Sequence, residues 1–168
     1  MAKIIAIANQ KGGVGKTTTA VNLSACLAVK NKKVLVIDID PQGNTTSGFG
    51  VDKNSVKNSI YDVIINEIPI QDTLIETMIK KLHLSPSNIN LAGAEVELVS
   101  VISRETRLKY ALEDIKDNYD FIIIDCPPSL GLLTINALTA ANTLLVPIQC
   151  EYYALEGLSQ LMNTVKMI

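Results

Sequence analysis

The eight residues from Lys11 to Thr18, K-G-G-V-G-K-T-T, constrain this chain more than any other segment. An apolar run from Lys3 to Ala8 precedes them and predicts a strand that is buried on both faces. Residues Thr17 to Lys30 follow with apolar side chains at helical spacing. Glycines between a strand and a helix let several backbone N–H groups converge on one anion, and the helix N-terminus adds its positive end. The segment therefore predicts a phosphate-binding loop.

Two side chains of this loop suit a nucleotide that carries a divalent cation. Lys16 can give a full positive charge to the terminal phosphates, and the Thr17 hydroxyl can complete the shell of Mg²⁺. The usual pattern of such loops has a glycine five positions before Gly15, where this chain has Gln10. Lys11 stands at the head of the loop instead. We interpret it as a lysine that serves the nucleotide of a neighbouring subunit, with a solvent-exposed lysine as the alternative.

Two acidic segments are expected at the same end of the sheet as this loop. The sequence D-I-D-P at 38–41 follows the apolar run Val34 to Ile37, and Asp125 ends the apolar run Phe121 to Ile124. In open parallel sheets, ligands bind at the carboxyl ends of the strands, so these carboxylates would approach the phosphates. One carboxylate can hold Mg²⁺ while another orients the attacking water. Asp38 and Asp40 share a side if strand geometry continues, and the alternative is a pair of turn-forming aspartates before proline.

Alternating strand and helix patterns predict an α/β fold, a three-layer sandwich with a mainly parallel twisted sheet flanked by helices. The region from 45 to 103 is harder to interpret. The remaining expected elements are helices over Ser59 to Ile65, Arg107 to Lys116 and Gly131 to Ala141, strands over Leu82 to Leu84, Ile89 to Leu91 and Leu144 to Ile148, and either type over Leu74 to Ile79. Leu155 to Ile168 reads as an amphipathic helix without a cap, so we expect a single domain over 1–168 that is truncated at its C-terminus.

The composition indicates a cytosolic globular protein. The 168 residues are 48% hydrophobic with a net charge of −2, so charge alone gives no reason to expect nucleic-acid binding. No apolar run approaches the ~18 residues of a membrane span, and the first one is too short for a secretory signal. Cys26, Cys126 and Cys150 are expected to be buried free thiols in a reducing cytoplasm. His83, between two leucines, is expected to be a strand or core residue.

Taken together, Lys11 to Thr18, Asp38 to Asn44 and Asp125 to Ser129 resemble the ParA/Soj family of chromosome and plasmid partition ATPases. Gln149 to Gly157 also resembles that family. Because members of the family continue beyond the matching part, the resemblance implies that 1–168 is the N-terminal two-thirds of a longer domain. The resemblance implies a P-loop NTPase-like fold of the deviant Walker A class and slow hydrolysis of ATP with Mg²⁺. It further implies a homodimer that encloses ATP, a ParB/Spo0J-like centromere-binding partner, and non-specific DNA binding through a C-terminal surface absent from this chain. The expected location is cytoplasmic, associated with the nucleoid in the ATP state and not with a membrane.

The resemblance also implies residue roles. Lys11 would cross a dimer interface to the phosphates of the partner, Gly12 would leave room there, and Asp40 would position the hydrolytic water. Glu151 would approach the ribose or the partner subunit. The implied catalytic residues are Lys11, Lys16 and Asp40; the nucleotide-binding residues are Lys11, Gly12, Gly13, Val14, Gly15, Lys16, Thr17 and Thr18; and the metal-binding residues are Thr17, Asp38 and Asp125.

Other functions are alternatives to partition. A MinD-like membrane or cell-division positioning switch would need a basic amphipathic tail that binds lipid, and 155–168 carries a single lysine. Positioning of a protein cluster, rather than of a chromosome or plasmid, is a further alternative. An electron-transfer or metal-carrier relative would need exposed cysteines, and Cys126 is the candidate near the expected site. A non-enzymatic DNA-binding regulator would show no hydrolysis that depends on Asp40.

Overall fold

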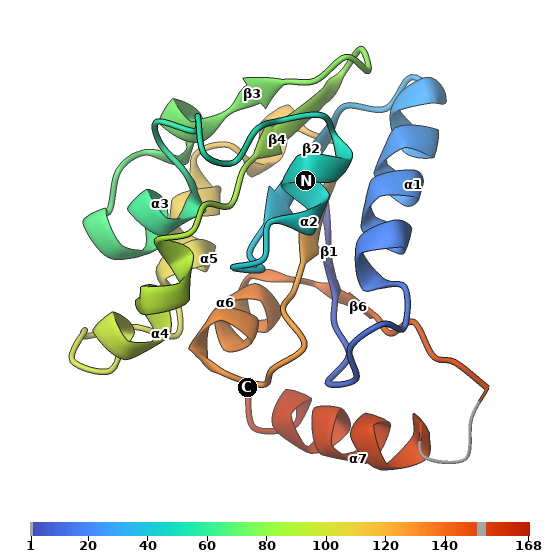
Figure 1. The fold of residues 1–168 in the computed structure, drawn as a ribbon, viewed down its shortest axis with the longest axis vertical. Coiled ribbons are helices and arrows are strands. Elements are labelled where there is room, and N and C mark those ends of the chain that lie inside the picture. Colours follow the sequence, from blue (N-terminus) through green and yellow to red (C-terminus); the bar gives the residue numbers. More distant parts are fainter. Residues whose placement is uncertain (1, 151–153) are drawn as a thin grey trace.

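A six-stranded sheet in the order β3-β4-β2-β5-β1-β6 forms the centre of the chain in the computed structural model, which describes residues 2–150 and 154–168 (Figure 1). Neighbouring strands are parallel, except that β3 pairs with β4 in antiparallel fashion. The strands are β1 (Lys3–Ile7), β2 (Val34–Asp38), β3 (Ile75–Glu76), β4 (Leu82–Ser85), β5 (Phe121–Asp125) and β6 (Thr143–Leu145).

Helices cover both faces of the sheet, which confirms the predicted α/β three-layer sandwich (Figure 1). Alternate residues of β1 enter two separate cores: Ile4 and Ala6 face the side of α3 to α6, whereas Ile5 and Ile7 face the side of α1. The helices are α1 (Lys16–Val29), α2 (Asn44–Gly48), α3 (Ile60–Asn66), α4 (Leu91–Leu98), α5 (Arg107–Glu113), α6 (Leu132–Ala140) and α7 (Ala154–Val165), with 3₁₀ turns η1 (Ile70–Thr73) and η2 (Lys116–Asn118).

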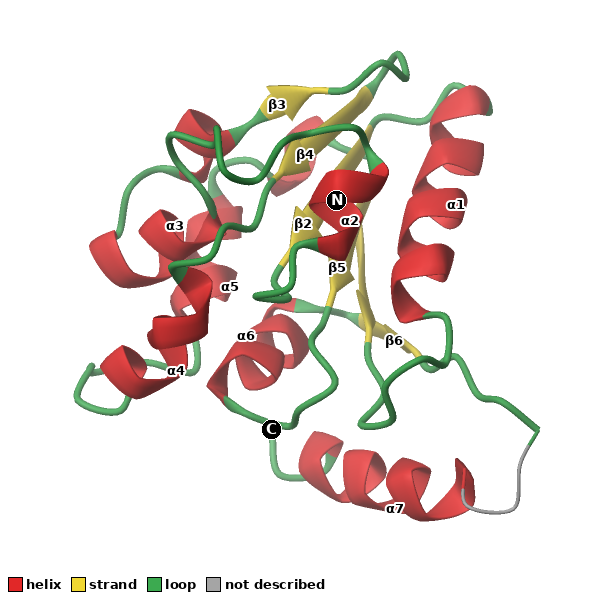
Figure 2. Ribbon diagram, viewed as in Figure 1, coloured by secondary structure: helices red, strands yellow, loops and turns green. Residues whose placement is uncertain are grey.

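The register of the three central strands brings their following loops together. Asp125 at the end of β5 pairs with Ile7 of β1 on one side and with Asp38 of β2 on the other. The loops that follow these strands therefore leave the sheet at one edge (Figure 2). Ligands of open parallel sheets bind at this edge.

Several predicted elements differ from the observed ones. The short strand expected over Ile89 to Leu91 is wrong, because a turn leads there into α4, whose residues Leu91, Ala94 and Leu98 are buried at helical spacing. The last strand is Thr143–Leu145 rather than Leu144 to Ile148, since β1 offers partners only from Ile5 to Ile7. The ambiguous segment Leu74 to Ile79 contains only the two-residue strand β3.

The cysteine prediction holds for one residue and fails for two. Cys126 is buried, whereas Cys26 on α1 and Cys150 after β6 are exposed. His83 lies in β4 as expected, with its Nδ1 2.7 Å from the hydroxyl of Tyr119. None of the helices in the described ranges has the length and apolar content that a bilayer crossing requires.

A capping box begins α3 at Ser59, the first residue of the predicted helix. The Ser59 hydroxyl accepts a hydrogen bond from the backbone N–H of Tyr61, and the Asp62 carboxylate accepts one from the backbone N–H of Ser59 at 2.9 Å. Replacing Ser59 with Ala leaves that first-turn N–H without its partner. We expect Ser59→Ala to lower the free energy of unfolding by about 1 kcal/mol in urea titrations. Ser55→Ala, at an exposed turn outside the helix, is the control, and an equal loss in both variants would contradict the role of the cap.

Candidate nucleotide-phosphate site

The loop between β1 and α1 has the backbone conformation that an anion site requires. Gly13 and Gly15 have φ angles of 72° and 91°, in the left-handed region that favours glycine. Gly15 is the N-cap of α1 and makes no side-chain capping bond, so the amides of the first turn remain available to a ligand. No atom outside the loop's immediate neighbours lies within 4 Å of where a Cβ would stand on Gly12, Gly13 or Gly15. A phosphate can therefore approach the backbone closely.

A cavity of about 380 Å³ opens above this loop. It combines the loop with two segments that are distant in sequence, and its lining residues are Gly12, Gly13, Gly15, Lys16, Thr17, Thr18, Asp40, Gln42, Asn44 and Pro128. Of the residues predicted from the sequence, the structure thus brings the loop and Asp40 together. Val14 is buried, and neither it nor Lys11 is part of the lining. Sequence reasoning missed Gln42, Asn44 and Pro128, although all three lie within the segments that it singled out.

Lys16 is almost completely buried, with 7% of its surface exposed. Its ammonium group donates a hydrogen bond of 3.0 Å to the backbone carbonyl of Lys11. Burial lowers the pKa of Lys16, and the negative charges of Asp125 and Asp40 oppose that shift. The ammonium is thus held inside the loop by a neutral acceptor, which a charged phosphate oxygen could replace with a stronger contact.

Asp125 presents a carboxylate oxygen without a partner. Its Oδ2 accepts hydrogen bonds from the hydroxyls of Thr17 at 2.9 Å and Thr45 at 2.6 Å, whereas its buried Oδ1 has no hydrogen bond. Burial raises the pKa of Asp125, against the effect of the two hydroxyls. A buried, unpaired carboxylate oxygen is rare and needs a ligand or a proton. Beside a threonine hydroxyl and a phosphate loop, this arrangement fits Mg²⁺, which prefers oxygen ligands.

Asp38 and Asp40 have different surroundings because β2 ends at Asp38. The side chain of Asp38 is fully buried, and its Oδ2 accepts hydrogen bonds from the backbone N–H and the hydroxyl of Thr46. Asp40 lines the cavity, and its Oδ1 accepts a bond of 2.9 Å from the backbone N–H of Gln42. The strand geometry on which a shared side depended does not continue, and of the two carboxylates Asp40 is the one in the cavity lining.

The burial of Asp38 has a consequence for stability that can be measured. Burial, opposed by the bonds from Thr46, raises the pKa of Asp38 from 3.8 to about 7. Between these values the folded chain holds a proton that the unfolded chain has lost, so this group lowers stability as pH rises. Asp38→Asn removes the titration. We expect the unfolding free energy of the variant minus that of the wild type to rise by at most about 1.4 kcal/mol per pH unit from pH 4 to 7, and then level off.

Urea titrations in metal-free buffer from pH 4 to 8 measure this difference. The hydrogen bonds that Asn cannot reproduce give an offset that does not depend on pH, so the slope carries the test. If the plots of unfolding free energy against pH stay parallel for the variant and the wild type, the raised pKa of Asp38 is contradicted.

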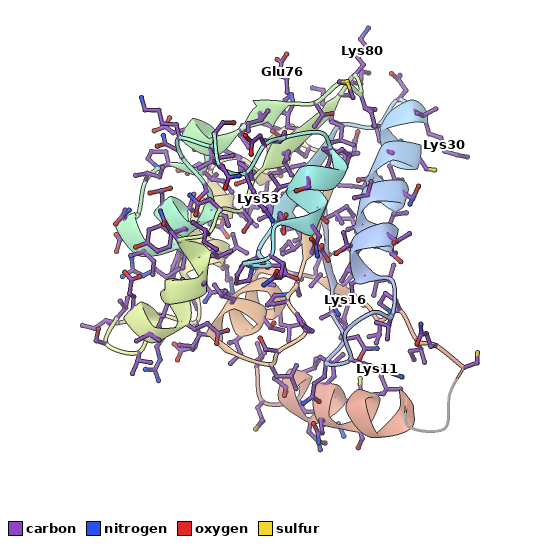
Figure 3. The ribbon with its side chains drawn as sticks, viewed as in Figure 1. Lys11, Lys16, Lys30, Lys53, Glu76 and Lys80 are labelled. Atoms are coloured by element: carbon purple, nitrogen blue, oxygen red, sulfur yellow. The ribbon has the colours of Figure 1, made fainter. Side chains whose placement is uncertain are left out.

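The phosphate loop is tied to the segment that follows β6. Asn9 accepts a hydrogen bond from the backbone N–H of Lys11 at 3.0 Å and donates one of 2.7 Å to the carbonyl of Pro147. The Gln149 amide donates to the carbonyl of Gly13 at 3.2 Å. In Figure 3, Lys16 lies at the start of α1, and Lys11 lies farther out, toward α7. The predicted contact of Glu151 lies outside the described residues.

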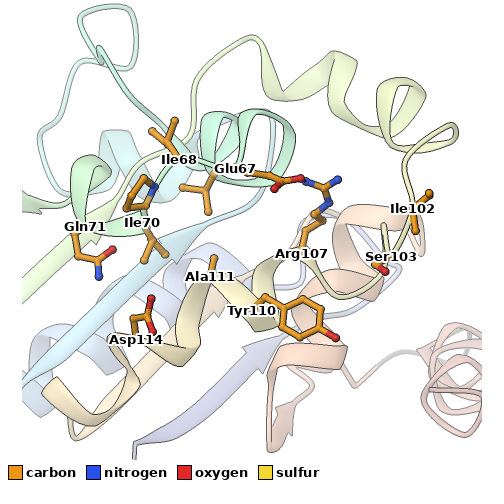
Figure 4. A pocket seen from close by; sticks show the side chains of 12 residues that line it. Glu67, Ile68, Ile70, Gln71, Ile102, Ser103, Arg107, Tyr110, Ala111 and Asp114 are labelled. Carbon is orange, nitrogen blue, oxygen red and sulfur yellow. The ribbon is translucent and has the colours of Figure 1, made fainter.

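A larger cavity, of about 680 Å³, lies between α3, η1 and α5 (Figure 4). Much of its lining is apolar, and the Arg107–Glu67 ion pair stands at its edge. It has no glycine-rich loop and does not lie at the carboxyl edge of the sheet. The smaller cavity is the better candidate because its charged and backbone polar groups converge.

Cys126 is not placed as a cluster ligand would be. Its side chain is fully buried, and burial raises the pKa of the thiol. Within residues 2–150 and 154–168, no group of three or more His, Cys, Asp or Glu side chains is arranged to hold a metal ion.

The phosphate loop between β1 and α1 puts this chain in the P-loop class of nucleotide-binding proteins. A family model described as an AAA domain matches residues 2–168. The sporulation initiation inhibitor protein Soj of Bacillus subtilis is 62% identical over 168 residues, which are 100% of this chain and 66% of that protein. The chromosome partitioning protein ParA of Myxococcus xanthus is 54% identical over 166 residues, 99% of this chain and 59% of that protein.

Among solved structures, cobyrinic acid a,c-diamide synthase from Mycobacterium smegmatis, with bound ATP analog and magnesium, superimposes with a TM-score of 0.94. It is 42% identical, and the match covers 99% of this chain and 68% of that one. The chain belongs to the AAA-domain family and, within it, to the ParA/Soj proteins. It spans slightly under two thirds of the Bacillus relative and 59% of the Myxococcus relative.

Proposed function

We propose that residues 1–168 form an ATPase domain that binds Mg-ATP in the 380 Å³ cavity and hydrolyses it slowly, as the switch of a chromosome or plasmid partition system. The observation that carries the proposal is the convergence of Lys16, Thr17 and Asp40 on one cavity, beside the unpaired Oδ1 of Asp125. The Mycobacterium structure bears the name of a synthase. Because the Soj and ParA relatives are more similar to this chain, at 62% and 54% against 42%, we favour partition.

The described residues suit in-line attack of water on the terminal phosphate. Lys16 and the loop amides would bind the phosphates, and Thr17 and Asp125 would hold Mg²⁺, which supplies charge neutralisation there. The Oδ1 of Asp40 accepts a hydrogen bond from the backbone N–H of Gln42, and its other carboxylate oxygen would orient the water. Asp38, the register partner of Asp125, would lie near the metal.

The proposed switch is a homodimer in which ATP lies between two subunits. Lys11 would reach the phosphates of the partner, as an arginine finger does. Gly12 supports such an approach, since no atom lies within 4 Å of where its Cβ would stand. The ATP dimer would bind DNA without sequence preference and associate with the nucleoid in the cytoplasm. A ParB/Spo0J-like protein would stimulate hydrolysis and release the subunits.

Mixing two inactive variants tests whether Lys11 acts across the interface. Lys11→Ala retains Asp40, and Asp40→Ala retains Lys11, so a mixed dimer contains one site with both groups. We expect each variant alone to hydrolyse ATP about 100-fold more slowly than wild type or worse, and an equimolar mixture to recover a substantial fraction of wild-type activity. Phosphate release measured against the mixing ratio gives the result. Unimpaired activity of Lys11→Ala alone, or a mixture no faster than its parts, would contradict the proposal.

A further inference from the structure

The side chain of Glu95 on α4 lies against Gly131, the N-cap residue of α6. Its Oε1 is buried and makes no hydrogen bond. A Cβ built on Gly131 would overlap both carboxylate oxygens of Glu95 and come within 2.5 Å of its Cδ. The side chain of Glu95 thus fills the space that an alanine at 131 would need.

Gly131 is the N-cap of α6 and makes no side-chain capping bond to that helix. The first-turn amides of a helix lack intrahelical partners and carry partial positive charge, so a carboxylate placed there stabilises the helix end. The backbone of Gly131, with φ −80°, is open to any residue. Glu95, rather than backbone strain, is therefore what opposes a side chain at 131.

The segment in front of α6 forms one wall of the phosphate cavity. It runs from Asp125, the candidate metal ligand, through Pro128, which lines the cavity, to Gly131. The Thr134 hydroxyl donates a bond of 2.6 Å to the carbonyl of Ser129, so the segment is fixed to the first turn of α6. Whatever holds that turn in place also holds this wall.

The other end of α4 is connected to the opposite wall. Ser87, just before α4, donates from its hydroxyl to the carbonyl of Asp40 at 2.7 Å. Its backbone N–H donates to the hydroxyl of Thr46 at 3.0 Å, and Thr46 in turn donates to Asp38. The segment 87–95 therefore contacts the Asp40 loop at one end and the start of α6 at the other (Figure 1).

From this arrangement we propose that Glu95 is a positioning residue. Its charge at the start of α6 holds the segment 125–131 against the phosphate cavity, and α4 fixes that segment relative to Asp40. The consequence for nucleotide binding rests on the proposed function. The consequence for the mobility of the segment does not, and it can be measured without nucleotide.

Hydrogen–deuterium exchange of the amides at 129–134 tests the proposal in the nucleotide-free 168-residue chain. Glu95→Ala removes the carboxylate, and Gly131→Ala displaces it from the same place. We expect each change to speed exchange there about fivefold, which is the size of effect that a carboxylate has on the stability of a helix N-terminus. Since both act on one contact, the double variant should show the same fivefold rise and not the product of the two.

Glu95→Gln keeps the shape of the side chain without its charge, and it should reproduce most of the rise. Glu97→Ala is the control, on the same helix but bonded to the hydroxyl of Tyr61 instead. In parallel, Glu95→Gln and Glu95→Ala should weaken Mg-ATP binding about fivefold, because the segment must then be ordered on binding.

Any one of three results would overturn the proposal. These are unchanged exchange in Glu95→Ala, exchange in Glu95→Gln equal to that of the wild type, and effects that multiply in the double variant. A wild-type chain that binds no ATP would instead contradict the proposed function and leave the exchange result standing. Exchange that rises as expected while ATP affinity stays at the wild-type value would refute the link to the cavity.

Discussion

A chain with Lys16→Ala is expected to bind Mg-ATP roughly 10- to 100-fold more weakly than wild type, and to show no measurable hydrolysis at ATP concentrations that saturate the wild type. The reason lies in the position of the ammonium group. It is buried at the start of α1 and is already hydrogen bonded to the carbonyl of Lys11, so little further ordering is needed when a phosphate replaces that carbonyl. Its loss leaves the phosphates with the loop amides and the helix dipole alone.

Titration calorimetry with a non-hydrolysable ATP analogue measures this loss directly. Lys30→Ala is the matched control, because Lys30 lies exposed at the other end of the same helix (Figure 3). Equal affinities in Lys16→Ala and Lys30→Ala would show that the cavity is not where the phosphates bind.

Asp40→Ala is expected to have the second large effect, on catalysis rather than on binding. Hydrolysis should fall about 100- to 10,000-fold, the range for a residue that handles the proton of the attacking nucleophile. ATP affinity should stay close to the wild-type value. The backbone of residue 40 is held by Ser87 and Gly43 in either case, so the loop keeps its place when the carboxylate is removed.

Single-turnover phosphate release and ATP titration separate these two quantities. Asp52→Ala removes a carboxylate from an exposed turn nearby in sequence and should match wild type in both. If Asp40→Ala loses affinity and rate by the same factor, the residue acts in binding, and the role of water positioning is wrong.

The parts of the site that could be predicted from sequence are those that chain connectivity brings together. Lys16 and Thr17 follow a strand and begin a helix, and this local order alone puts them at a helix N-terminus. Asp40 and Asp125 could be placed because parallel strands end at one edge. Where a carboxylate points after its strand has ended depends on loop geometry, so the sequence could not separate Asp38 from Asp40.

The contacts that sequence did not predict come from packing between distant segments. The hydroxyls of Thr45 and Thr46 on α2 bind Asp125 and Asp38, and nothing in the spacing of those residues indicates it. The same holds for α4. Ile89 and Leu91 alternate as in a strand over a short window, whereas the buried residues Leu91, Ala94 and Leu98 follow helical spacing where α4 packs against α3 and α6. The contact of Glu95 with Gly131 follows from that packing.

ATP is proposed to join two copies of this chain, and the molar mass of the Asp40→Ala chain tests this most directly. Light scattering should be recorded with Mg-ATP and again with Mg-ADP at the same protein concentration. We expect a dimer with Mg-ATP and a monomer with Mg-ADP. The same mass with both nucleotides would contradict it.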